Sequence, residues 1–273
     1  MSYKIFLTGD PTVTNHYHAL VEHMHNLFCA YNKIKETANV ICDKGRLQTY
    51  LDFCKIPFTV VMDNNGYENS QTYDLPERPR CKHITKEYIN HIQQIATDCN
   101  KEKIFNNKIV IQRKYNRRID DVTMNFLKQN GYKEYVLEDM PLQEQARLFN
   151  SASHVVCVHG SAIANMLFCN SNVRFIELNT GYNAYCFQEL AKHIFNNGGL
   201  FINHHILLPN EFKHGLTPCN IGNIPYYHSY NGRLIKTGIE QYHIISNTTV
   251  FQNRANKDPQ YVSVDITKLS NLI

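Results

Sequence analysis

The sequence predicts an α/β protein made of two Rossmann-like halves, each a parallel sheet covered by helices on both faces. Short, continuously apolar runs alternate along the chain with stretches that have the 3.6-residue period of a helix. Such runs are typical of strands buried on both faces of a parallel sheet. The alternation breaks down around residue 100 and then starts again. We therefore expect one half at 1–100 and a second at 101–254, with the tail from about 255 to 273 returning to the first half.

The N-terminal half is expected to begin with a strand at 4–9, KIFLTG, followed by a helix near 15–31. Apolar, β-branched runs then predict strands at 39–43 and 58–63. The last element is a helix over 84–99, where apolar residues recur with a helical period. This order of elements is typical of a parallel α/β unit.

The C-terminal half repeats the alternation with four apolar strands. They are expected at 108–114, 134–139, 154–160 and 174–179. Gly131 suits the left-handed cap at the end of one intervening helix, and Pro141 suits the first position of the next. Residues 203–260 are rich in loop-forming residues and give no clear assignment, whereas 261–273 predict a strand and a short helix.

Composition and charge indicate a globular protein suited to a small anionic ligand. Of the 273 residues, 43% are hydrophobic and 19% charged, so the chain can bury a sizeable core. A net charge of +4 suits a small anion better than a nucleic acid. Nine cysteines are scattered without a Cys-x-x-Cys pair, as in proteins of a reducing, cytosol-like compartment. No apolar stretch approaches the roughly 20 residues that span a bilayer, so we expect no membrane span.

One stretch, VVCVHGSAIANMLF at 155–168, changes abruptly from a β-branched run to small residues. In parallel sheets, ligands bind beyond the carboxyl ends of the strands, where helix N-termini present N–H groups to anions. Gly160, Ser161 and Ala162 would let a phosphate approach the backbone, and Asn165 lies one helical turn further along. A close-packed turn without a ligand is the alternative.

A basic cluster follows the strand at 108–114. Arg113, Lys114, Arg117 and Arg118 lie within IQRKYNRRID, and guanidinium groups bind phosphate oxygens through paired hydrogen bonds. A cluster at a strand end therefore favours a nucleotide diphosphate, and Arg113 is the strongest candidate because it directly follows the strand. A solvated basic loop is the alternative.

Glu177 ends another apolar strand, RFIELN, where a carboxylate could accept the hydroxyls of a ribose or cap the next helix.

The sequence has no G-x-G-x-x-G, no G-x-x-x-x-G-K-[ST] and no H-E-x-x-H, which disfavours dehydrogenases, P-loop proteins and zinc proteases. It also lacks Asp-x-Asp, which disfavours a pyrophosphate held through a metal bound to that motif. We predict no required cofactor and no metal, with a divalent cation as the alternative.

Acidic and imidazole side chains of the N-terminal half could act as a general base. His18 and Glu22 are four residues apart and share a helical face, so the carboxylate could orient the imidazole. An exposed helix with an incidental pair is the alternative. Asp10 and Asp74 are further candidate acids. The pairs His16 with His18 and His23 with His25 could suggest a metal, but their spacing places the members on different faces, and we expect surface histidines.

Four motifs in this order resemble glycosyltransferase family 61, over residues of about 15 to 180. They are NHYHALVE, QRKYNRR, EQARLFNSASHVVCVHGSAIANMLF and RFIEL. The positions that match the family pattern are Asn15, His18, Glu22, Arg113, Arg117, Arg118, Glu144, Gln145, His159, Gly160, Ser161, Asn165 and Glu177. Ser161 stands where many members of the family have alanine.

The resemblance implies a GT-B fold and an inverting transfer from a UDP-sugar to a glycan or glycoprotein. It assigns the donor to the C-terminal half, where Arg113, Arg117 and the amides of 160–162 would stabilise the leaving diphosphate and His159 would bind a phosphate. The base would come from the acceptor-side N-terminal half, among Asp10, His18, Glu22 and Asp74. The family suggests xylose as the donor sugar, with N-acetylglucosamine as the alternative.

Two other function classes compete with this interpretation. One is a non-catalytic protein of the same fold that binds nucleotide-sugars or carbohydrates. The other is a different Rossmann-class enzyme, such as a methyltransferase or epimerase, which the single glycine of TGDPTVTNH disfavours. The N-terminus shows no signal anchor, so the chain resembles the compact transferases that large DNA viruses encode, and we expect it in the cytoplasm.

Overall fold

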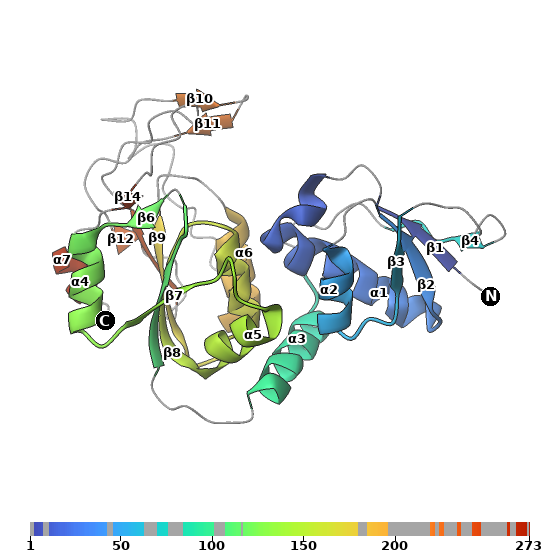
Figure 1. The fold of residues 1–273 in the computed structure, drawn as a ribbon, viewed down its shortest axis with the longest axis horizontal. Helices are drawn as coiled ribbons and strands as arrows, with labels where there is room; N and C mark the ends of the chain where they lie inside the picture. The colour runs from blue at the N-terminus through green and yellow to red at the C-terminus, as the bar shows by residue number, and fades with distance from the viewer. Residues whose placement is uncertain are drawn as a thin grey trace.

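A computed structural model of the chain shows two units, each built on its own parallel sheet (Figure 1). It describes residues 3–7, 11–42, 46–62, 70–75, 84–100, 107–115, 117–179 and 185–195, and short segments at 219–221, 224–226, 234–235, 242–246, 261–262, 266–271 and 273. The predicted α/β class with parallel sheets is confirmed, in the two-unit arrangement that a GT-B fold requires.

The N-terminal sheet has four parallel strands in the order β3-β2-β1-β4. These are β1 (Tyr3–Phe6), β2 (Ala38–Ile41), β3 (Thr59–Val61) and β4 (Gln71–Thr72). The helices of this unit are η1 (Pro11–Thr14), η2 (His18–His23), α1 (Met24–Ile34), α2 (Leu47–Phe53) and α3 (Lys86–Cys99). The three predicted strands and both predicted helices are confirmed, whereas α2 and β4 were not predicted.

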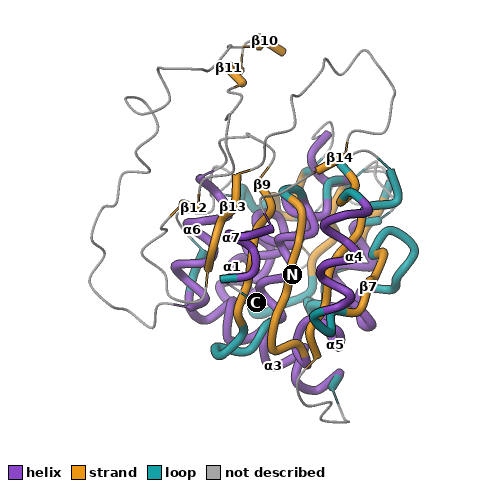
Figure 2. The backbone as a smooth tube through the Cα atoms, turned by 90° about the vertical axis from the view of Figure 1, so that its left-hand side faces the viewer, coloured by secondary structure: helices purple, strands orange, loops and turns teal. Residues whose placement is uncertain are grey.

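The C-terminal sheet has six strands in the order β12-β13-β9-β8-β5-β7, and Figure 2 shows β12, β13 and β9 towards one side of the molecule and β7 towards the other. The strands are β5 (Asn107–Gln112), β7 (Lys133–Val136), β8 (Ala152–Val158), β9 (Arg174–Asn179), β12 (Leu234–Ile235) and β13 (Tyr242–Ser246). Only the edge pair β12–β13 is antiparallel among these described strands. A short hairpin, β10 (Cys219–Ile221) with β11 (Ile224–Tyr226), lies apart from this sheet.

Helices cover both faces of the C-terminal sheet. They are α4 (Asp121–Gln129), α5 (Leu142–Ser151), the 3₁₀-helix η4 (Ser161–Phe168), α6 (Tyr185–Phe195) and α7 (Ile266–Ser270). Successive residues of β8 alternate between two apolar clusters, with Val155 on the α5 side and Val156 on the α4 side. The continuous apolar run of β8 is therefore explained by burial on both faces.

The ends of two helices test the predicted caps. Helix α4 is followed by Gly131 at φ 84°, and the N–H of Tyr132 donates to the carbonyl of Leu127 at 3.1 Å. This Schellman geometry confirms the prediction for Gly131. Pro141 is the N-cap of α5, one residue before the predicted position, because its ψ of 148° is still extended.

The C-terminal tail packs on the C-terminal unit. Strand β14 (Tyr261–Val262) pairs in parallel with β6 (Arg118–Ile119), and α7 lies at the same end of the molecule as α4 (Figure 1). Leu269 is fully buried in the same apolar cluster as Ile119. The prediction that the tail rejoins the N-terminal half was therefore wrong for the described part of the tail, because its buried leucine completes the α4 side of the other unit.

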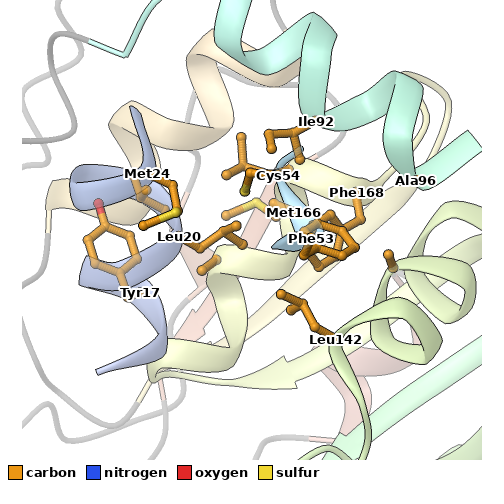
Figure 3. Packing of buried hydrophobic residues seen from close by; sticks show 14 of the residues in the cluster. Tyr17, Leu20, Met24, Phe53, Cys54, Ile92, Ala96, Leu142, Met166 and Phe168 are labelled. Carbon is orange, nitrogen blue, oxygen red and sulfur yellow. The ribbon is translucent and has the colours of Figure 1, made fainter. Parts of the chain in front are cut away.

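The two units share one continuous hydrophobic core (Figure 3). Leu20, Met24 and Phe53 of the N-terminal unit pack with Met166 and Phe168 of η4. The rings of Phe53 and Phe168 meet edge to face with centroids 5.4 Å apart. This apolar contact fixes the unit that carries η2 against the unit that carries η4.

Two irregular helices meet at this contact. The helix η2 is a π-helix, and η4 is a 3₁₀-helix of eight residues, longer than most 3₁₀ segments. Such departures from α-helical geometry are frequent at functional sites. Seven cysteines are in the thiol form, namely Cys29, Cys42, Cys54, Cys99, Cys157, Cys169 and Cys186. In the part of the chain that the structure describes, no helix has the length and apolar character needed to cross a membrane.

Candidate active site

The carboxyl ends of two neighbouring strands bring an arginine loop against a glycine. Strands β5 and β8 are adjacent and parallel, with Ile111 opposite Cys157, so the residues that follow them lie side by side. A Cβ at Gly160 would lie 3.0 Å from Nη1 of Arg113 and 3.8 Å from Nη2 of Arg117. A side chain at Gly160 would press on the Arg113 guanidinium, whereas its contact with Arg117 would be of ordinary length.

Arg113 has unused hydrogen-bonding capacity at this point. Its Nη1 is buried and has no partner among the described residues, which is costly for a charged donor. Arg117 donates from Nη1 to the carbonyl oxygen of His159 at 3.1 Å. Beside them η4 begins at Ser161, and the first N–H groups of a helix have no partner within it. Cationic side chains and free amides thus converge at one point, which suits an anion with several oxygens.

His159 and Glu177 form a buried pair next to this point. Nδ1 of His159 lies 2.5 Å from Oε1 of Glu177, and the two residues are 3% and 2% exposed. Because a carboxylate accepts hydrogen bonds, Nδ1 of His159 carries a proton that it donates to Glu177. Glu177 thus orients His159.

His18 and Glu22 face the same region from the N-terminal unit. Nδ1 of His18 lies 2.8 Å from Oε2 of Glu22, and their side chains are 32% and 7% exposed. A series of edge-to-face ring contacts connects them to the other unit. Tyr17 contacts His18 at 5.4 Å and Phe187 at 5.1 Å, and Phe187 contacts His159 at 4.9 Å. The pair is therefore part of the junction between the units rather than an exposed, incidental contact.

A chain of four polar side chains crosses between the units. Gln145 accepts from Nδ2 of Asn165 at 2.9 Å, Oδ1 of Asn165 bonds Nε2 of His16 at 2.7 Å, and Nδ1 of His16 bonds the hydroxyl of Tyr50 at 2.8 Å. Asn165 is fully buried. Its two polar groups are satisfied by Gln145 and His16, so in this geometry it joins the units.

Two backbone carbonyl groups at the Gln145 end determine which groups donate and which accept along these hydrogen bonds. Nε2 of Gln145 donates to the carbonyl oxygens of Met140 at 2.8 Å and Leu137 at 3.2 Å, so its Oε1 must face Asn165. Asn165 then presents Oδ1 to His16, whose Nε2 must carry the proton. Burial raises the pKa of Tyr50 to about 12, so the phenol remains protonated and donates to Nδ1 of His16. His16 is held as one neutral tautomer.

Comparison with known proteins places the chain in a family. The family described as Glycosyltransferase 61 matches residues 7–176, well over half of the chain. The chain belongs to this family. The matched segment contains the described residues of the junction from His16 to Asn165, whereas Glu177 and Phe187 lie beyond it.

Two solved structures are similar to this family 61 member in fold. One is the dodecameric iron-containing heptosyltransferase TibC in complex with ADP-D-β-D-heptose, at 11% identity over 66% of this chain and 58% of that chain, with a TM-score of 0.38. The other is TibC from enterotoxigenic E. coli H10407, at 12% identity over 66% and 57%, with a TM-score of 0.37. The chain therefore spans less than two thirds of the length of either structure. No curated protein matches the chain.

Some predicted site residues of this family 61 member lie elsewhere. Glu144 is exposed on α5, and Asp74 is exposed just after β4. No hydrogen bond or ion pair among the described residues joins either one to the other candidates. Asn15 accepts from the N–H of Tyr17 at 2.9 Å and so shapes the turn before η2. Arg118 begins β6, and Asp10 lies outside the described residues.

Two histidines that were expected at the surface are buried. His23 is 2% exposed and bonds Oγ1 of Thr12 at 3.0 Å, and His25 is 4% exposed and accepts from the N–H of Thr85 at 3.1 Å. The prediction of surface histidines was wrong for these two, because η2 and the start of α1 turn them towards neighbouring backbone and hydroxyl groups. Within the described ranges, no group of three or more His, Cys, Asp or Glu side chains is placed to hold a metal.

The junction should make stability depend on pH through His16. Burial lowers the pKa of His16 below its ordinary value of 6.5, although the hydrogen bond to Asn165 opposes this shift. Below about pH 6.5, His16 takes up a proton in the unfolded chain but not in the folded protein. The free energy of unfolding should therefore decrease as the pH is lowered, until the pKa of His16 in the folded protein is reached. Urea unfolding from about pH 8 to about pH 5 should show this loss.

The His16→Gln variant is the matched comparison, because glutamine does not titrate. Its unfolding free energy should fall less than that of the wild type over the same pH range. Burial and the charges of Lys108 and Arg174 also lower the pKa of His154, so part of the pH dependence should remain in this variant. Parallel pH curves for the two proteins would contradict the assignment to His16.

Proposed function

We propose that this protein is an inverting glycosyltransferase that moves a sugar from a UDP-sugar to a glycan hydroxyl. The observation that carries the proposal is the buried, unpartnered Nη1 of Arg113 beside Gly160, with Arg117 and the start of η4 next to it. A diphosphate would supply anionic oxygens to all three groups. Membership of glycosyltransferase family 61 supports the same assignment.

Inversion requires an acceptor hydroxyl to attack C1 of the sugar from the side opposite the diphosphate. The hydroxyl proton passes to a base, the C1–oxygen bond to the diphosphate breaks, and UDP leaves with the negative charge. Arg113, Arg117 and the amides at Gly160–Ala162 would stabilise that charge, and His159 would donate to a phosphate oxygen from Nε2 when both of its ring nitrogens carry protons. No metal is required by this scheme, because the leaving charge is met by side chains and amides.

His18 is the base that the geometry favours. Its side chain is 32% exposed whereas that of Glu22 is 7% exposed, so an acceptor can reach the imidazole more easily than the carboxylate. Glu22 would accept the Nδ1–H of His18 and leave Nε2 to take the proton. This role distinguishes an enzyme from a non-catalytic nucleotide-sugar-binding protein, which would need no such pair.

The donor sugar and the compartment are proposed on separate grounds. We propose xylose as the transferred sugar, with N-acetylglucosamine as the alternative, because of the family resemblance. We propose a reducing compartment, the cytoplasm, because seven of the nine cysteines are in the thiol form.

The Arg113→Ala variant tests the proposal. Loss of a charge-assisted contact should weaken UDP binding by roughly 1.5–3 kcal/mol, or about 10- to 150-fold. Isothermal titration calorimetry would measure this change. Arg147→Ala is a suitable control, because Arg147 is exposed on α5 and bonds the carbonyl of Cys99, away from Gly160. Equal UDP affinity in wild type and Arg113→Ala would remove Arg113 from the site.

A ligand panel tests the donor class directly. Thermal shift with UDP-, GDP- and CMP-sugars, each with and without EDTA, should show stabilisation by UDP-sugars that EDTA does not abolish. Stabilisation by GDP- or CMP-sugars instead would contradict the uridine assignment, and loss of the shift in EDTA would contradict a metal-independent site.

A further inference from the structure

Gln112 is the last residue of β5 and is 3% exposed. We propose that Gln112 is a positioning residue that holds the following loop, which carries Arg113 and Arg117, in the form that receives the diphosphate. This inference rests on the proposed function of those arginines. Gln112 is the first residue of the motif QRKYNRR, but it is not among the positions that the sequence assigns to the site.

The Gln112 side chain closes the loop through three hydrogen bonds. Its Oε1 accepts from the N–H of Ile119 at 2.9 Å and from the N–H of Arg113 at 3.0 Å. Its Nε2 donates to the carbonyl oxygen of Ile119 at 3.1 Å. The amide thus pairs with both backbone groups of Ile119, as a neighbouring strand would, and also fixes the first residue of the loop.

The other end of the loop is held by the two-stranded sheet that β6 forms with β14. Ile119 belongs to β6, which pairs with β14, and its side chain is buried in the apolar cluster that contains Leu269. Gln112 therefore ties the start of the loop to a fixed point. Without this tie, the start of the loop would be held by the end of β5 and by Lys114, whose N–H donates to Oε1 of Glu138 at 3.0 Å.

The loop contains a backbone conformation that needs such support. Arg117 has φ 54°, in the left-handed region that residues with a side chain rarely adopt. Unfavourable conformations of this kind persist where the surrounding structure holds them, and they are common at functional sites. Here the conformation turns the Arg117 guanidinium towards the carbonyl of His159 and Gly160. Gln112 and Ile119 supply the support on the two sides of this residue.

Gln112→Met tests the proposal, because methionine has a similar length but makes none of the three bonds. We expect the dissociation constant for UDP to rise about tenfold, measured by calorimetry well below the melting temperature, because a mobile loop loses part of the charge-assisted contact. Gln112→Glu is a second variant in case the first does not fold. It keeps the acceptor for both N–H groups but cannot donate to Ile119 when ionised, so a smaller rise is expected.

Gln48→Met is the matched control. Gln48 also holds a loop through its side-chain amide, accepting from the N–H of Val60 at 2.8 Å and donating to the carbonyl of Phe58 at 3.5 Å, but it lies in the N-terminal unit. This variant should lower the melting temperature without changing UDP affinity. If Gln112→Met and Gln112→Glu lower the melting temperature but bind UDP as the wild type does, Gln112 is merely structural and the proposal is overturned.

Limited trypsin digestion gives a readout that does not depend on the nucleotide. Cleavage after Arg113, Lys114 and Arg117, located by mass spectrometry, should be faster in Gln112→Met than in wild type or Gln48→Met. Unchanged cleavage would overturn the proposed role of Gln112. If the wild type itself does not bind UDP, the proposed function fails, and the cleavage pattern alone then decides whether Gln112 holds the loop.

Discussion

Replacing His18 by alanine should lower the rate of glycosyl transfer by about 10²- to 10⁴-fold while leaving UDP affinity within about twofold of wild type. The reason is the arrangement of His18 and Glu22, in which the carboxylate holds Nδ1 at 2.8 Å and the half-buried imidazole faces the junction. A general base contributes to the transition state but not to binding of the nucleotide, so the loss should appear in kcat. Release of UDP from a UDP-sugar with a glycan acceptor would measure the rate.

His91→Ala is the control for this prediction. His91 lies on α3, where its Nε2 bonds the carbonyl of Cys54 at 2.7 Å, and it takes no part in the site. Its loss should leave both turnover and UDP affinity unchanged. A His18→Ala enzyme that turns over at the wild-type rate would exclude His18 as the base, and a large loss of UDP affinity would show instead that His18 serves the donor.

Replacing Phe168 by alanine should lower the free energy of unfolding by about 3–5 kcal/mol. Phe168 is fully buried, and its ring meets that of Phe53 across the contact between the two units. The cavity would open where the units share their core, so both should lose stability together. Denaturant unfolding followed by far-ultraviolet circular dichroism would measure the change, and we expect one transition at a lower midpoint.

Two comparisons make the Phe168 prediction specific. Phe168→Leu keeps most of the buried volume and should cost clearly less than the alanine variant. Val122→Ala removes an exposed apolar group, because Val122 is 70% exposed, and should be nearly neutral. Two separate transitions, with only the C-terminal one shifted, would contradict a core shared by the two units.

The strands were predictable because their physical cause is local. Residues 155–158 of β8 are all apolar since both faces of the strand are covered there, and this pattern is visible in the sequence. Helix α2 has only seven residues, about two turns, too few for a helical period to stand out, so it was missed. The tail was misplaced because nothing local shows against which unit Leu269 is buried.

The part of the site that lies at the ends of strands was predictable from the sequence. Because the carboxyl ends of parallel neighbours meet, the sequence predicts that Arg113 and Gly160 lie close together, and they do. The partners of buried polar groups were not predictable, since Asn165 and His16 are 149 residues apart. Likewise, the carboxylate of Glu177 was considered for a ribose, but in the structure it binds His159.

Tyr50, Phe187 and Gln112 are among the residues that sequence reasoning missed. Tyr50 lies on the unpredicted helix α2, Phe187 lies beyond the motifs, and Gln112 resembles any polar residue at a strand end. Only Gln112 gave a signal, because a glutamine next to an arginine-rich loop can replace missing backbone partners. That signal is weak without knowledge of where Ile119 lies.

A crystal structure of the protein with UDP would show whether the diphosphate binds at Arg113 and the start of η4. The diphosphate should lie within hydrogen-bonding distance of the Arg113 guanidinium and of the amides that open η4, next to Gly160. A nucleotide bound in another part of the molecule, with the Arg113 guanidinium still unpartnered, would rule out a diphosphate site at Arg113.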